Sequence, residues 1–293
     1  MMGELFSVAN KVVVITGGSR GIGGMLAQGF VDGGARTYIT SRSADELQKT
    51  QTELAAVGDC IAIQSDLSTM DGVRDFVAAL SEREPRVDVL INNAGAAWGA
   101  PFAEFPEAGW DKIMDLNVKA IFFLTQGFLP LLQAAGTAED PARVINIASI
   151  NGLTYPGVPN YSYSASKAAV IQLTRHLAVD LAADNINVNG IAPGYFPSKM
   201  TAGLLSKFED QLVERTPRKR VGQQEDIAGA AIYLASRAAA WVVGQTLVVD
   251  GGITVASRMP VAREAPADHR SSLDARNGRN AETPAGRPRI RWH

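Results

Sequence analysis

Cysteine and histidine are scarce in this sequence. Cys60 is the only cysteine, and the three histidines are His176, His269 and His293. A single cysteine can form neither an internal disulfide nor a zinc site built from several thiolates, and this usage is typical of a reducing compartment. With so few histidines, two of them near the C-terminus, we expect no metal site and no histidine-based catalysis, which disfavours hydrolase chemistry.

Excess charge and long hydrophobic runs are also missing. The formal net charge is -2, so no overall field attracts nucleic acid or an anionic membrane. Residues 1–11 have no charged-then-apolar arrangement, and the apolar run that follows is broken at Gly17, too early to span a bilayer. We therefore expect a cytoplasmic protein that binds a small molecule rather than nucleic acid or a membrane.

The composition is that of a packed globular protein with a different C-terminal end. Hydrophobic residues make up 46% and charged residues 20% of the 293 residues. Residues 256–293 are rich in Arg and Pro and have almost no apolar periodicity. The sequence predicts one domain over residues 1–255, followed by a disordered tail over residues 256–293.

Seven short runs predict strands, and longer amphipathic segments between them predict helices. The expected strands are 11–16, 36–40, 61–66, 87–92, 143–149, 186–191 and 246–250. The expected helices are 21–32, 44–57, 70–83, 110–134, 163–183 and 226–235. Within most strands apolar residues are consecutive, as in Val12 to Ile15, which is typical of strands covered on both faces. This pattern predicts a single α/β domain with a Rossmann-like, doubly wound, parallel seven-stranded sheet and helices on both faces.

A glycine-rich segment, Thr16 to Gly23, lies between the first expected strand and the first expected helix. Glycines allow a tight turn and a close approach of the backbone to a pyrophosphate, and the N–H groups at the helix start bind its charge. The spacing is G-x-x-x-G-x-G rather than G-x-G-x-x-G. The position between strand and helix is the context that a dinucleotide site requires.

Charge at the end of the second expected strand indicates which dinucleotide is bound. An acid there would hold the ribose 2′-hydroxyl of NAD, but the first carboxylate is Asp45. Arg42 and Arg20 are instead suited to pairing with a 2′-phosphate, which favours NADP(H), although both arginines are also compatible with solvated surface positions. Asp66 is suited either to the adenine amino group or to capping the next helix.

Tyr163 and Lys167 stand one helical turn apart at the start of an expected helix. A free tyrosine, with a pKa of about 10, is a poor acid-base group at neutral pH. An ammonium about 4 Å away would favour the tyrosinate by about 4 kcal/mol at most, because desolvation acts the other way. Ser149, at the end of a strand, is positioned to hold a carbonyl oxygen, and Asn117 is an amide in an apolar helix that orders either a water or a backbone group.

Over residues 8–252 these motifs resemble the short-chain dehydrogenase/reductase family. The resemblance is carried by Thr16 to Gly23, Asn92-Asn93-Ala94-Gly95, Pro193-Gly194 and the set Asn117, Ser149, Tyr163 and Lys167. It implies that Tyr163 is the general acid/base, Ser149 positions substrate, Lys167 binds the nicotinamide ribose and tunes Tyr163, and Asn117 sustains a proton-relay water. The cofactor contacts that the resemblance implies are Gly17, Ser19, Arg20, Gly21, Ile22, Gly23, Arg42, Asp66, Leu67, Asn93, Ala94, Gly95, Tyr163, Lys167, Pro193, Gly194 and Ser198.

Within the family, residues 216–228 and 249–252 resemble 3-oxoacyl-[acyl-carrier-protein] reductases, and residues 191–201 resemble the ketoacyl reductases associated with rhamnolipid synthesis. The function expected from this resemblance is NADPH-dependent reduction of a 3-oxoacyl thioester or a related ketone. Two alternatives stay open: oxidation of a secondary alcohol of a sugar, polyol or steroid, and a non-catalytic regulator that senses NADP(H). The family also implies a homotetramer or homodimer, assembled through the helices 110–134 and 163–183 and the last strand.

Overall fold

The computed structural model describes residues 2–256, and its centre is one parallel seven-stranded sheet. The strands are β1 Val12–Thr16, β2 Arg36–Ser41, β3 Cys60–Gln64, β4 Val89–Asn92, β5 Ala142–Ile147, β6 Ile186–Pro193 and β7 Thr246–Val249. Their order in the sheet is β3-β2-β1-β4-β5-β6-β7, and every neighbouring pair is parallel. The predicted fold class is confirmed. The order of strands reverses between β1 and β4, where open α/β sheets bind their ligands.

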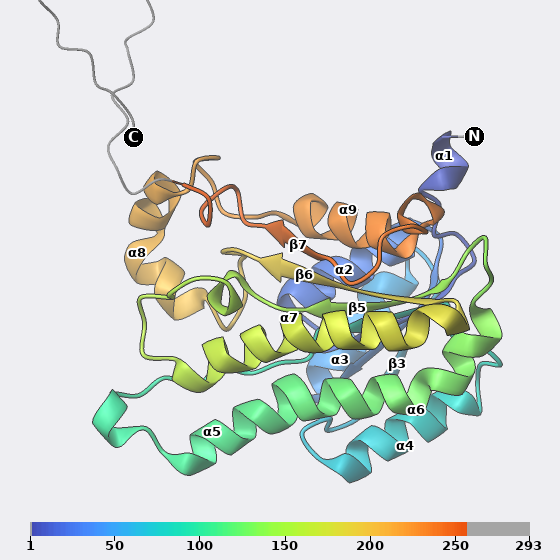
Figure 1. Cartoon of the computed structure of the whole chain (residues 1–293), viewed down its shortest axis with the longest axis horizontal. Helices are drawn as coiled ribbons and strands as arrows, with labels where there is room; N and C mark the ends of the chain where they lie inside the picture. Colours follow the sequence, from blue (N-terminus) through green and yellow to red (C-terminus); the bar gives the residue numbers. More distant parts are fainter. Residues whose placement is uncertain (1, 257–293) are drawn as a thin grey trace, which may run out of the picture. The chain divides into compact units, whose positions relative to one another are not determined.

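Helices cover both faces of the sheet (Figure 1). The α-helices are α1 Met2–Leu5, α2 Gly21–Asp32, α3 Ala44–Ala55, α4 Met70–Ser81, α5 Glu107–Met114, α6 Ala120–Ala135, α7 Tyr161–Leu181, α8 Ala202–Arg215 and α9 Gln224–Ala235. Short 3₁₀ helices span Phe102–Glu104, Ile150–Gly152, Ala182–Asp184 and Arg237–Ala239. α2, α3 and α9 pack on one face of the sheet, and α4, α6 and α7 pack on the other.

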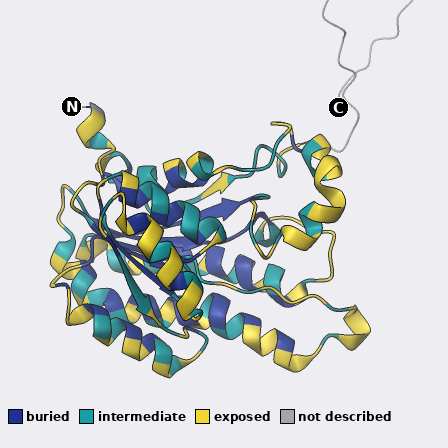
Figure 2. Cartoon of the chain, turned by 180° about the vertical axis from the view of Figure 1, so that it is seen from behind, coloured by how far each residue is buried: buried dark blue, intermediate teal, exposed yellow. Residues whose placement is uncertain are grey.

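Alternate residues of the central strands supply the two cores. In β1, Val13 and Ile15 belong to the cluster with α2, α3 and α9, whereas Val12 and Val14 belong to the cluster with α4, α6 and α7. All five residues of β1 are buried. Figure 2 shows the buried strands enclosed by helices whose outer faces are exposed. Burial on both faces is the physical reason for the consecutive apolar residues in the sequence.

One predicted helix differs from the structure, and α8 was missed. The expected helix 110–134 begins earlier, at Glu107, and is interrupted by a π-helical turn, Asp115–Lys119, so that α5 and α6 are separate segments. α8 was not predicted as a helix at all; it has no buried residue and contains a non-helical Phe208. The other five predicted helices agree with the structure to within two residues at each end.

The stretch from Glu107 to Ala135 is long and apolar enough, by length and composition alone, to cross a membrane. In the structure its apolar residues serve the core: Leu116, Ile121, Leu124, Phe128 and Leu132 are buried. A third of its most apolar window is buried, so much of its surface remains exposed.

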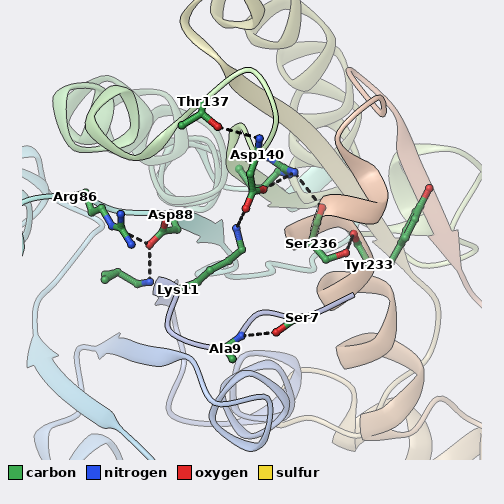
Figure 3. Close-up of polar contacts among 11 residues, drawn as sticks. Ser7, Ala9, Lys11, Arg86, Asp88, Thr137, Asp140, Tyr233 and Ser236 are labelled. Atoms are coloured by element: carbon green, nitrogen blue, oxygen red, sulfur yellow. Dashed lines mark hydrogen bonds and ion pairs between the residues drawn. The ribbon is translucent and has the colours of Figure 1, made fainter. Parts of the chain in front are cut away.

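At the amino ends of the strands, charged groups tie several elements together (Figure 3). Lys11 Nζ donates to Asp140 Oδ2 at 2.7 Å, and Arg143 Nη2 donates to Asp140 Oδ1 at 3.2 Å and to the Ser236 carbonyl at 3.0 Å. Asp88 Oδ2 accepts the Val12 N–H at 2.8 Å. This network joins the segment before β1, the loop before β5 and the end of α9.

Residues up to Ala256 form one compact unit. The expected tail, apart from Ala256, lies outside the described residues.

Candidate active site

A cleft of about 510 Å³ opens at the carboxyl ends of the strands. Its size is within the range of small-molecule and cofactor sites. It is lined by the glycine-rich turn after β1, the ends of β2 to β6 and the segment before α8. All of the predicted cofactor-contact residues line this one cleft, and Ser149, Tyr163 and Lys167 line it with them. Of the predicted site residues, Asn117 is the exception.

The glycine-rich turn is closed so tightly that side chains would not fit. A Cβ on Gly23 would lie 2.1 Å from the Gly17 carbonyl oxygen, and Gly17 itself has a φ of +65°. Asn93 Nδ2 holds the turn by donating to the carbonyl oxygens of Thr16 and Gly17, at 2.8 and 3.2 Å. Thr16 Oγ1 in turn accepts the Asn93 N–H at 2.9 Å. Asn93 therefore fixes the shape of the turn, a structural contact that the sequence did not indicate.

Each of the two arginines that line the cleft has an acidic neighbour. Arg20 pairs with Glu46 of α3, and Arg42 Nε lies 3.9 Å from Asp66 Oδ1. All four side chains are 40% or more exposed, so these pairs are weak and open to exchange. The capping alternative for Asp66 is wrong: Thr69 caps α4, and Asp66 Oδ1 accepts from the Ser68 N–H and hydroxyl.

Tyr163 lies in the first turn of α7, and Ser149 follows the end of β5. Ser149 is two residues beyond the strand rather than its last residue, and its Oγ accepts the Asn151 N–H at 3.1 Å. The Tyr163 phenol is buried, and this burial raises its pKa above the ordinary value; a hydrogen bond with Ser149 lowers the pKa by a smaller amount. At neutral pH the phenol is therefore protonated.

The expected effect of Lys167 on the Tyr163 pKa is not found. Lys167 Nζ lies 5.7 Å from the centroid of the Tyr163 ring and donates to the Ile147 carbonyl at 2.7 Å. The ammonium is buried, which lowers the pKa of Lys167 to about 8. The sequence argument placed a full charge at contact distance from the phenolic oxygen. Desolvation of both groups is the larger effect in the structure.

Asn117 lies in the π-helical turn and is fully buried behind the cleft. Its Oδ1 accepts the Ala96 N–H at 2.9 Å, and its Nδ2 donates to the Ala96 carbonyl and to Ser166 Oγ, both at 3.0 Å. Ser166 Oγ donates to the Tyr163 carbonyl at 2.7 Å. Of the two roles that the sequence left open, the structure shows the amide ordering a backbone group.

Several cleft residues were not predicted from the sequence. They are Thr40, Ser41, Ser65, Ala96, Ala97, Leu116, Ile147, Ala148, Lys199, Met200 and Thr201. Most of them follow strand ends, a signal that was available; Lys199 and Met200 lie before α8, the helix that was missed. Within residues 2–256, no group of three or more His, Cys, Asp or Glu side chains is placed to hold a metal ion.

A parallel sheet of this order, with a glycine-rich turn and a Ser, Tyr and Lys set in one cleft, defines a dinucleotide-dependent oxidoreductase. Residues 17–254 match the profile of the family described as Enoyl-(Acyl carrier protein) reductase. The chain belongs to the short-chain dehydrogenase/reductase family.

Individual relatives are similar over almost their whole length. The rhamnolipids biosynthesis 3-oxoacyl-[acyl-carrier-protein] reductase of Pseudomonas aeruginosa is 46% identical over 255 residues, 86% of this chain and 99% of the relative. The gluconate 5-dehydrogenase of Gluconobacter oxydans is 40% identical, over 86% of this chain and 98% of the relative. Among solved structures, the Pseudomonas aeruginosa RhlG/NADP active-site complex superposes with a TM-score of 0.83 at 45% identity, covering 86% of this chain and 99% of that one.

Proposed function

We propose that this protein is an NADPH-dependent reductase that converts a 3-oxoacyl thioester or a related ketone into the alcohol, with Tyr163 as the general acid. The observation that carries the proposal is that Ser149, Tyr163 and Lys167 line the same cleft as the glycine-rich turn, with Ser149 close enough to the phenol to lower its pKa. A carbonyl oxygen held between two hydroxyls is polarised and has a proton donor at hand.

The cleft suits a phosphorylated dinucleotide. The glycines of the turn, Gly17, Gly21 and Gly23, line the cleft with backbone, and α2 begins there with its N–H groups free of side-chain caps. Arg20 and Arg42 supply positive charge for a 2′-phosphate. The similar Pseudomonas aeruginosa structure is an NADP complex. When bound, the reduced cofactor supplies the hydride.

In the proposed reaction the protein residues handle the proton and the oxygen. The Ser149 hydroxyl donates a hydrogen bond to the substrate oxygen, and Tyr163 gives its proton to that oxygen as the carbonyl carbon is reduced. The raised pKa of Tyr163 keeps the phenol protonated at neutral pH, which suits reduction. Lys167, whose ammonium lines the same cleft, is placed to bind the nicotinamide ribose, and Asn117 holds the backbone at Ala96 and the first turn of α7.

Replacement of Tyr163 by phenylalanine tests the mechanism, and Tyr161→Phe is a matched control. Tyr161 lies on the same turn of α7 but does not line the cleft. With NADPH absorbance as the readout and 3-oxoacyl thioesters as substrates, Tyr163→Phe should lose about 10²- to 10⁴-fold in kcat while NADPH affinity is retained. Tyr161→Phe should keep its rate; full turnover by Tyr163→Phe would refute the assignment.

A second candidate is oxidation of a sugar acid or polyol, because the Gluconobacter oxydans relative is named a gluconate 5-dehydrogenase. The same hydroxyl and lysine would serve as base in that direction. Parallel assays distinguish the two functions: 3-oxoacyl thioester with NADPH in one, gluconate with NADP⁺ in the other. The higher kcat/KM identifies the substrate class.

We also propose a homotetramer or homodimer. The supporting observation is exposed apolar surface on the elements that the family resemblance implies: Phe122 on α6, Val179 on α7 and Leu247 on β7 are 38%, 77% and 38% exposed. Exposed apolar surface is a common feature of interaction sites. Sedimentation of the purified protein as a monomer would contradict this proposal.

A further inference from the structure

The residues just before α8 form a tight turn. The Thr201 N–H donates to both the carbonyl and the Oγ of Ser198, each at 3.2 Å. Thr201 Oγ1 donates to the Phe196 carbonyl at 2.6 Å. These bonds fix residues 198–201, so Lys199 and Met200 occupy the tip of the turn, and both line the cleft.

This turn lies directly over the glycine-rich segment. A Cβ placed on Gly21 would be 3.0 Å from the Cβ of Ser198. Gly21 is the first residue of α2 and has a φ of +54°. The N-terminus of α2 is the end at which a dinucleotide's diphosphate is bound in this kind of fold. Lys199, next to Ser198, therefore lies beside that end of the cleft.

Lys199 differs from the other basic residues of the cleft. Four basic side chains line the cleft: Arg20 pairs with Glu46, Arg42 lies near Asp66, and Lys167 donates to a backbone carbonyl. Lys199 has no ion-pair or hydrogen-bond partner within residues 2–256, and it is exposed. It is a cation on a long, flexible side chain that can turn toward an anion without breaking an existing bond.

We infer that Lys199 binds the diphosphate of the cofactor and so fastens the turn 198–201 onto the bound dinucleotide. The inference rests on the proposed function, because it requires a dinucleotide in the cleft. The diphosphate is favoured over the 2′-phosphate because Ser198 lies against Gly21 at the start of α2, whereas Arg42, which follows β2, supplies charge for the 2′-phosphate.

Direct binding measurements test this inference without turnover. Dissociation constants of NADPH and NADH are measured by nucleotide fluorescence for wild type, Lys199→Gln, Lys199→Arg and Lys207→Gln. Lys207 is the matched control, because it is an exposed lysine of α8 that does not line the cleft. Lys199→Gln should weaken both nucleotides by the same factor, about tenfold, as expected for the loss of one charge-assisted hydrogen bond.

The remaining variants and salt complete the test. Lys199→Arg and Lys207→Gln should both have the dissociation constants of wild type. The loss of affinity in Lys199→Gln should become smaller at 0.5 M salt, where charges are screened within about 4 Å. If Lys199→Gln weakened the binding of NADPH but not of NADH, the contact would be with the 2′-phosphate and the inference would be overturned. Unchanged dissociation constants in Lys199→Gln would overturn it as well. Absence of nucleotide binding by wild type would instead overturn the proposed function itself.

Discussion

The buried Lys167 ammonium should lower the stability of the fold, and its replacement by methionine should reveal by how much. Burial lowers the pKa of Lys167 from 10.5 to about 8. At about 1.36 kcal/mol for each pH unit between these values, the cost of burying the charged form is about 3 kcal/mol at pH 7. Methionine has a similar length and no charge, but it also leaves the Ile147 carbonyl without its donor, a loss of about 1 to 2 kcal/mol. Lys167→Met should therefore be more stable than wild type by about 1 to 2 kcal/mol at pH 7.

The pH dependence identifies the cause. Between pH 8 and pH 10.5 the unfolded chain holds the Lys167 proton while the folded chain has released it, so the unfolded state binds more protons and wild-type stability rises with pH in this window. Below pH 8 the full cost is present. At pH 10 the cost has fallen to about 1 kcal/mol, and the advantage of the methionine variant should disappear.

Urea unfolding of the cofactor-free protein at pH 7, 8.5 and 10 measures this difference. Lys207→Met, at an exposed position, should show a difference from wild type that does not change with pH. An advantage of Lys167→Met that stays constant from pH 7 to pH 10, or a loss of stability at pH 7, would refute the reasoning. Reductase activity of Lys167→Met should be lost at every pH.

Three further variants test the turn, the amino-end network and the choice of cofactor. Gly23→Ala should destabilise the fold by about 1 to 3 kcal/mol and abolish nucleotide binding, because the added Cβ would meet the Gly17 carbonyl. Gly24→Ala is the control: its Cβ would have no atom nearer than 3.8 Å, so this variant should unfold no more readily than wild type. Asp140→Asn leaves the buried Arg143 guanidinium without its carboxylate and should lower the free energy of unfolding, measured in urea, by about 2 kcal/mol. The loss is smaller than for a fully buried pair because Asp140 is 31% exposed. Arg42→Ala should weaken NADPH about tenfold and leave NADH unchanged in a fluorescence titration; equal effects on both would contradict its pairing with a 2′-phosphate.

The strands could be predicted from sequence because burial on two faces leaves a mark in the residues themselves. Val12 to Ile15 is apolar without a break, since each alternate residue faces one of the two cores. The start of α2 could be predicted to the exact residue because a glycine-rich turn precedes the helix. α8 could not, because none of its residues is buried and its apolar positions therefore face no core.

The composition of the cleft was predictable to the extent that strand ends supply it, but its electrostatics were not. Spacing puts Lys167 one turn from Tyr163, yet it does not reveal how far each titrating group is desolvated, and desolvation has the largest effect on both pKa values. Asn117 is similar: a π-helical turn adds a residue to the helix, so helical periodicity cannot tell which way its amide faces. Such features depend on packing between distant segments.

The two ends of the sheet differ in how their charges are arranged. At the amino ends Lys11 and Arg143 share one carboxylate, so positive charge there is compensated within the fold. At the carboxyl ends, the buried Lys167 donates to a carbonyl and has no carboxylate partner within the described residues, and Lys199 has no partner there at all. Uncompensated positive charge costs stability in a chain without ligand, and the same charge is what an anionic cofactor would neutralise. Because the glycine-rich turn opens onto that same end, the cost is concentrated where a bound dinucleotide would offset it, and cofactor binding should stabilise the fold by more than its contacts with the turn alone provide.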